Sequence, residues 1–176
     1  MNKKRNTNAM PAGRRGFILI ELLVAMAIFV VVITIVFDLF SSAIRGQRRV
    51  IAMQNTQENA RFMLEFMAKE IRMSVVSGSN GISGNLSITR SDGDIVTYSI
   101  ANGKIIRNSP SSNDAISADE VYVTGNFYLE GMGADNAQPK VTIALKVQGV
   151  GSRPEEQAFM NVQTTLSQRV LDSSGL

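Results

Sequence analysis

Hydrophobic residues dominate one uninterrupted stretch near the start of the chain, residues 17–37, which reads FILIELLVAMAIFVVVITIVF. With a rise of about 1.5 Å per residue, a helix of this length would measure about 31 Å, close to the thickness of the hydrocarbon core of a bilayer. The stretch contains one carboxylate, Glu21. Placing a carboxylate in such a segment costs about 2.5–3.5 kcal/mol. The pattern therefore predicts a membrane-spanning helix in which Glu21 has a specific role.

The pattern remains helical after this stretch. No Pro occurs between Pro11 and Pro110, and Gly46 is the only Gly between residues 17 and 76, so we expect one helix over about residues 17–76. Its second half carries mostly apolar residues at intervals of three and four, which is typical of an amphipathic helix. This stripe comprises Val50, Met53, Gln57, Ala60, Leu64, Met67, Ile71 and Val75, with Met63 beside it. We expect the stripe to pack on the chain's own C-terminal domain rather than to form a free coiled coil.

From about residue 78 the pattern changes to short alternating runs separated by turn residues. Runs at 86–90, 95–100 and 104–107 predict an antiparallel meander, because Asp-Gly and Asn-Gly turns separate them. Further strands are expected at 121–124, 126–130, 141–147 and 158–166, with polar loops at 108–120, 131–139 and 149–156. The runs on either side of Gly125 form either a pair or one strand bent there. The predicted fold class is α+β, with a long N-terminal helix packed on a C-terminal antiparallel β-sheet.

The net charge of +3 arises from the first sixteen residues. They contain five basic side chains and no acid, so the rest of the chain carries two more acids than bases. These five are Lys3, Lys4, Arg5, Arg14 and Arg15. The remainder has no overall basic footprint for nucleic acid. The basic leader also predicts a cytoplasmic N-terminal end, because its five charges outnumber Arg45, Arg48 and Arg49 beyond the apolar stretch.

The chain contains neither Cys nor His. It therefore lacks thiolate chemistry, the commonest general base and the commonest metal ligand. We expect no enzyme activity, no catalytic residues, no cofactor and no metal. Paired acids at 119–120 and 155–156 could hydrolyse glycosides only in a cleft, and we interpret them as solvated surface. Turn chemistry likewise accounts for the acids of the predicted loops better than calcium binding does, because residues 91–94 lack EF-hand spacing. These acids are Asp92, Asp94, Asp114, Asp119, Glu120 and Asp135.

The junction between the leader and the apolar stretch resembles that of type IV pilins and type II secretion pseudopilins. The matching residues are Arg14-Arg15-Gly16, Phe17, Glu21 and Leu22-Leu23-Val24-Ala25. The resemblance implies that a prepilin peptidase cuts between Gly16 and Phe17 and methylates the new Phe17 amine. It also implies a filament-core helix in which Glu21 pairs with the Phe17 amine of a neighbouring subunit. The alternatives for Glu21 are a protonated membrane carboxyl or a transporter residue, although a single span offers no transport path.

Several shorter phrases resemble the J-type minor pseudopilins and the W-type minor pilins. They are residues 57–62 and 70–72 on the predicted helix, 96–98 and 103–107 in the predicted meander, and the final segment 159–169. Many major pilins have Pro where this chain has Asp38, which also favours a minor subunit.

We therefore expect a minor pilin or pseudopilin, a structural subunit of a type IV pilus or a type II secretion pseudopilus. The alternatives are a major pilin, or a pilus-tip adhesin or DNA-binding subunit. The implied partners are other subunits, the prepilin peptidase, an inner-membrane assembly platform and the lipid bilayer. The expected segments are a leader (1–16), a transmembrane and filament-core helix (17–43), an amphipathic helix (44–77) and a globular β domain (78–176). The expected location is the bacterial inner membrane, single-pass, with the C-terminal domain periplasmic or extracellular, and then the pilus or pseudopilus.

Overall fold

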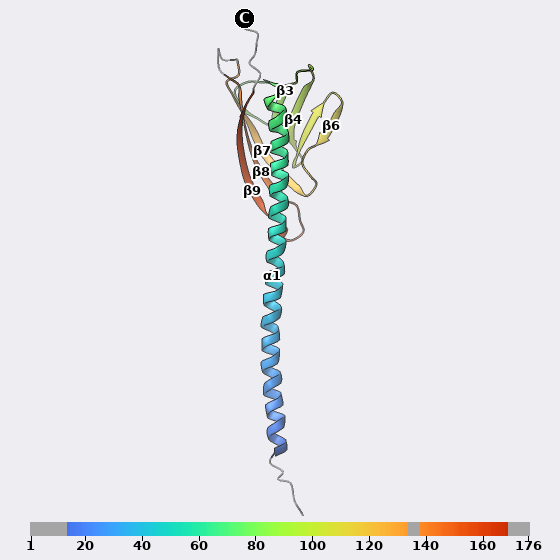
Figure 1. The fold of residues 1–176 in the computed structure, drawn as a ribbon, viewed down its shortest axis with the longest axis vertical. Helices are drawn as coiled ribbons and strands as arrows, with labels where there is room; N and C mark the ends of the chain where they lie inside the picture. Colours follow the sequence, from blue (N-terminus) through green and yellow to red (C-terminus); the bar gives the residue numbers. More distant parts are fainter. Residues whose placement is uncertain (1–13, 134–137, 169–176) are drawn as a thin grey trace, which may run out of the picture. The chain divides into compact units, whose positions relative to one another are not determined.

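A single helix, α1 (Arg14–Arg72, 59 residues), forms the N-terminal part of the fold (Figure 1). The structure is a computed structural model that describes residues 14–133 and 138–168. The chain divides into two compact units, residues 1–45 and 46–176, and α1 contributes residues to both. The helix begins at Arg14, before the start predicted at residue 17. The rest of the predicted leader, residues 1–13, lies outside the described residues.

The helix ends at Arg72, earlier than the predicted end near residue 76. The backbone N–H groups of Met73 and Ser74 donate to carbonyls three residues earlier, at 3.2 and 3.3 Å, which closes the last turn in the 3-10 manner. The chain then extends into strand β1 (Val75–Ser77). Two successive β-branched valines favour this extended conformation.

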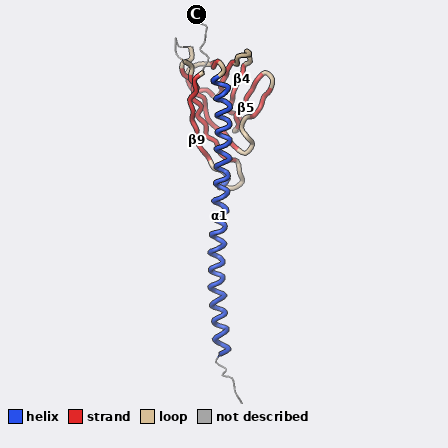
Figure 2. Tube along the Cα trace, in the orientation of Figure 1, coloured by secondary structure: helices blue, strands red, loops and turns tan. Residues whose placement is uncertain are grey.

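Two antiparallel sheets make up the rest of the second unit (Figure 2). The five-stranded sheet has the order β1-β3-β4-β5-β6, and the four-stranded sheet has the order β2-β7-β8-β9. The remaining strands of the first sheet are β3 (Asn85–Thr89), β4 (Ile95–Ala101), β5 (Lys104–Ser109) and β6 (Ser112–Ala115). Those of the second are β2 (Gly81–Ser83), β7 (Val121–Glu130), β8 (Lys140–Gly149) and β9 (Phe159–Ser167). A short 3-10 helix, η1 (Pro154–Glu156), precedes β9.

These sheets confirm the predicted α+β class and the predicted meander, which is β3-β4-β5. The prediction of one sheet was wrong, because the strands divide between two. The predictions also missed β1, β2 and β6, which have three or four residues each and no clear alternation. Strand β6 lies in a segment predicted to be loop. Its residues, Ser-Asn-Asp-Ala, have little strand propensity, so its pairing with β5 determines its conformation.

The chain around Gly125 forms one continuous strand, β7, rather than a pair. A Cβ atom at this position would lie 2.1 Å from the backbone oxygen of Ala144 on β8. No side chain fits at that distance, so the close approach of the two strands requires glycine.

The core lies between the C-terminal part of α1 and the inner faces of the two sheets. On the helix, Ala60, Met63, Met67 and Ile71 are almost completely buried, and they pack in one cluster with inward-facing residues of β3, β4, β5, β7, β8 and β9. The predicted stripe is thus confirmed in its C-terminal half. Its N-terminal half was wrong, because Val50 and Gln57 are exposed and the buried position there is Thr56.

Candidate functional site

The first candidate is the apolar part of α1. Every described side chain from residue 18 to residue 43 is exposed. A window of 18 residues in this part has a mean hydropathy of 3.0, and none of it is buried. The helix is therefore long and apolar enough to cross a membrane. So large an exposed apolar surface also indicates that other molecules cover it, because soluble monomers rarely expose such a surface.

Thr34 and Glu21, two of the polar residues within 18–43, differ in whether their side chains have a hydrogen-bond partner. The Thr34 hydroxyl donates to the backbone oxygen of Val30 at 2.8 Å, so its hydrogen bond is made within the helix. Glu21 is exposed and has no hydrogen-bond or ion-pair partner among the described residues. A carboxylate in apolar surroundings needs a partner. In apolar surroundings Glu21 would therefore either stay protonated or need a partner from outside the described residues.

The predicted cleavage site lies one helical turn before Glu21. The backbone of Gly16 and Phe17 belongs to α1, while their side chains lie outside what the structure describes. Residues four apart share one face of a helix, so positions 17 and 21 lie on the same side of α1. Asp38, near the other end of the apolar part, is exposed.

The second candidate is a polar cluster in which Glu70 of α1 meets the five-stranded sheet. Arg107 of β5 donates to both oxygens of the Glu70 carboxylate, through Nη2 at 2.7 Å and Nε at 3.0 Å. The buried Tyr98 hydroxyl on β4 also donates to this carboxylate. Tyr98 and Arg107 lie directly opposite each other in the β4–β5 register, which places both donors at one point of the sheet.

The cluster holds Glu70 in its charged form. Burial alone would raise the pKa of Glu70, but the hydrogen bonds from Arg107 and Tyr98 and the charges of Arg107 and Arg90 outweigh burial and lower it. The same hydrogen bond to Glu70 raises the pKa of the Arg107 guanidinium. Burial, followed by the bond to Glu70, raises the pKa of Tyr98 far above its ordinary value. A carboxylate that already accepts these hydrogen bonds is a poor general base. The cluster instead links α1 to β4 and β5.

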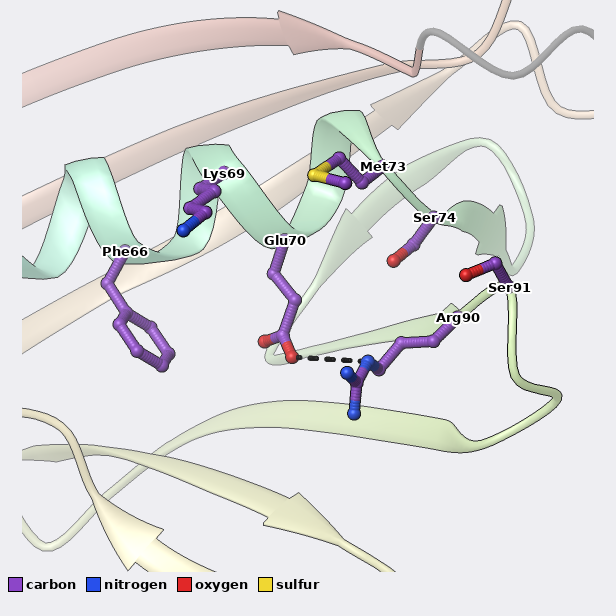
Figure 3. Close-up of a pocket in the computed structure, with 7 residues that line it drawn as sticks. All are labelled: Phe66, Lys69, Glu70, Met73, Ser74, Arg90 and Ser91. Carbon is purple, nitrogen blue, oxygen red and sulfur yellow. Dashed lines mark ion pairs between the residues drawn. The ribbon is translucent and has the colours of Figure 1, made fainter.

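A pocket of about 360 Å³ opens beside this cluster (Figure 3). It is lined by Phe66, Lys69, Glu70, Met73, Ser74, Arg90 and Ser91. Arg90 reaches Glu70 at 3.9 Å and Asp92 at 3.5 Å, so its charge is partly neutralised within the chain. The sequence alone does not predict this cluster. Arg107 shares a strand face with the buried Ile105, and a cation at an inward-facing strand position is the signal that predicts a buried acidic partner.

Two acids of the predicted loops, Asp92 and Asp119, have side-chain partners in the structure. Asp92 accepts the backbone N–H of Asp94 at 3.0 Å, as expected for turn chemistry. Asp119 is exposed and pairs with Lys104. No three acids come together as a metal site within residues 14–133 and 138–168, and Asp135 lies outside these ranges.

Comparison of the whole chain with models of protein families, with curated proteins and with solved structures gives no match.

Proposed function

We propose that this chain is a minor pilin or pseudopilin, a non-enzymatic subunit of a type IV pilus or a type II secretion pseudopilus. It inserts in the bacterial inner membrane through the apolar part of α1 and loses its leader by cleavage before Phe17. It then joins a filament in which neighbouring helices replace lipid around the apolar surface. The second unit, residues 46–176, lies outside the cytoplasm.

The observation that carries this proposal is the exposed apolar part of α1 with one unpartnered acid near its start. Side chains 18–43 make no buried core of their own, yet they form a helix that continues into the folded second unit. A plain membrane anchor accounts for the apolar surface but not for Glu21. A filament accounts for both, because a neighbouring subunit supplies apolar side chains and the Phe17 ammonium.

The position of Glu21 supports the same proposal. Cleavage before Phe17 would create an amine on the helix face that Glu21 shares. A carboxylate and an ammonium in an apolar bundle offset their desolvation only when they pair closely. Each subunit would therefore be held at the axial position where its Glu21 meets the amine of a neighbour. The pair sets the register of assembly more than it adds stability.

The test is the mass of the mature protein. We expect the full chain, isolated from the membranes of a host with a prepilin peptidase, to lack residues 1–16 and to carry a methyl group on Phe17. Gly16→Leu should retain the leader, because a bulky side chain obstructs the bond to be cut. Gly46→Leu is the matched control, since a Cβ atom added there meets no atom within 4 Å. Normal loss of residues 1–16 from Gly16→Leu would refute the proposed site.

A further inference from the structure

Strand β9 is a long edge of the four-stranded sheet (Figure 1). The other sheet edges, β1, β2 and β6, have only three or four residues each, whereas β9 has nine. Proteins usually protect long edges with charged side chains, prolines or bulges, because an open edge can pair with another strand. The sequence of β9, FMNVQTTLS, contains no charged residue, no Pro and no Gly.

The hydrogen-bond ladder between β8 and β9 determines which backbone groups of β9 point away from β8. The N–H of Gly149 donates to the oxygen of Ala158 at 2.8 Å, which fixes the alternation of the ladder. Even-numbered residues of β9 therefore bond to β8, and odd-numbered residues direct their N–H and C=O groups outward. These are Phe159, Asn161, Gln163, Thr165 and Ser167. Among the described residues no strand pairs with this outer side.

The side chains of β9 are also less well covered than those of β8. On β8, Ile143, Leu145 and Val147 are at most 3% exposed. Their partners in the register are Thr164, Val162 and Met160 on the same inner face, and all three are only half-buried. The described residues thus leave the inner face of the sheet at β9 only partly covered. A further strand with apolar residues at alternate positions would complete this cover.

We propose that the outer edge of β9 binds an extended segment of another subunit of the assembly, which adds a fifth strand to the four-stranded sheet. The inference rests on the proposed function for the identity of the partner. Backbone hydrogen bonds give such an addition its affinity, and alternate side chains give it specificity. The bound segment is uncharged where it faces β9, because β9 offers no opposite charge. Its inward side chains are apolar and cover Met160 and Val162.

The first experiment maps contacts along the edge in the full chain, in the membranes of cells that assemble the filament. A photo-reactive amino acid replaces Asn161, Gln163 or Thr165 in turn, and Asn126 on the outer face of β7 is the control. We expect adducts with one neighbouring subunit from all three edge positions and not from Asn126. The crosslinked residue on the partner should move by two residues for each step of two along β9, because paired strands keep register.

The second experiment blocks the edge. Gln163→Pro removes an outward N–H and leaves the ladder with β8 intact, a position where strands tolerate proline. We expect adduct yields from positions 161 and 165 to fall by about tenfold or more, because backbone bonds dominate strand addition. Gln163→Thr, which keeps the N–H, should give wild-type yields. If Gln163→Pro does not fold, Val162→Lys replaces it, since an inward lysine on an edge strand also prevents pairing.

The outcomes separate this inference from the proposed function. Normal leader removal and filament incorporation without edge adducts would overturn the β9 proposal alone. Adducts that lack the two-residue progression would overturn it as well, as would adducts joining β9 strands of two copies of this chain, which would indicate a symmetric dimer. Retention of the leader would overturn the proposed function, while edge adducts with the expected progression would still support strand addition.

Discussion

At the scale of single residues, two polar residues in the apolar part of α1, Thr34 and Glu21, can be compared directly. Thr34 and Glu21 are both polar and both exposed, but only the Thr34 hydroxyl is satisfied within its own helix. Removing the Thr34 hydroxyl leaves no other group without a partner. Removing the Glu21 carboxylate from an assembled filament would leave the ammonium of a neighbouring subunit unpaired in apolar surroundings. Substitutions at these two positions therefore distinguish the effect of losing any polar side chain from the effect of losing a specific ion pair.

We expect Glu21→Val to insert in the membrane at least as well as wild type and to be cleaved normally, because a desolvation cost of about 2.5–3.5 kcal/mol disappears. Its incorporation into filaments should fall by at least about a hundredfold, since an unpaired buried partner costs about 3–5 kcal/mol. Thr34→Val should assemble normally. The measurement compares sheared filaments with the membrane pool in cells that lack the wild-type chain. Wild-type incorporation of Glu21→Val would show that the apolar helix alone drives assembly.

Glu70 provides a second prediction at this scale, on stability rather than assembly. Its side chain is 17% exposed, and Gln in its place would keep one acceptor oxygen but lose the second acceptor and the negative charge that Arg107 and Tyr98 face. We expect Glu70→Gln to lower the free energy of unfolding at pH 7 by about 3 kcal/mol, the low end for a broken buried pair. Glu65→Gln, which removes an exposed helical pair with Arg61, should cause no measurable change. Urea unfolding of the full chain in detergent measures both.

The effect of Glu70→Gln should depend on pH. Because the folded state lowers the pKa of Glu70, its stabilising contribution is complete above about pH 5 and is lost as the pH falls below about 4. The stability difference between wild type and variant should therefore shrink at low pH. A difference that stays constant between pH 7 and pH 3 would show that shape, not charge, is what Glu70 contributes.

At the scale of elements, the sequence predicted the long, strongly patterned segments. The apolar run, the alternating strands β4 and β8 and the Asp-Gly and Asn-Gly turns carry their own local signals. The short strands β1, β2 and β6 carry none, because their conformation follows from pairing with β3, β7 and β5, respectively. The cluster around Glu70 was missed for a related reason. It joins three elements, and only the β4–β5 register brings Tyr98 and Arg107 to one place.

The close approach of β7 and β8 gives a prediction for these elements. In Gly125→Ala the added Cβ would meet the Ala144 oxygen at 2.1 Å and the Leu145 Cα at 2.9 Å, so two backbones must separate. We expect a loss of about 2–3 kcal/mol in the free energy of unfolding, at the upper end for overpacked sites. Gly84→Ala, where nothing lies within 4 Å, should change it by less than about 0.5 kcal/mol. Equal stability of the two variants would contradict the tight β7–β8 contact.

At the scale of the whole molecule, the two units differ in what stabilises them. The first, residues 1–45, has no buried side chain among its described residues, so it depends on its surroundings. The second, residues 46–176, contains all of the buried apolar core. A chain built this way can exchange one environment of its first unit for another, lipid for neighbouring helices, without repacking the second. The proposed function requires this property.

This division predicts the behaviour of a fragment that begins at Gly46. We expect residues 46–176 to be soluble without detergent and to unfold cooperatively, with a free energy within about 1 kcal/mol of the full chain in detergent, because none of the described side chains among the deleted residues, 18–45, is buried. A fragment that begins at residue 64 should be strongly destabilised, since it lacks the buried Thr56, Ala60 and Met63. Phase partitioning and thermal unfolding followed by circular dichroism measure both fragments. If the longer fragment unfolded like the shorter one, the first unit would have to stabilise the second, and the exchange of lipid for neighbouring helices would then disturb the folded domain.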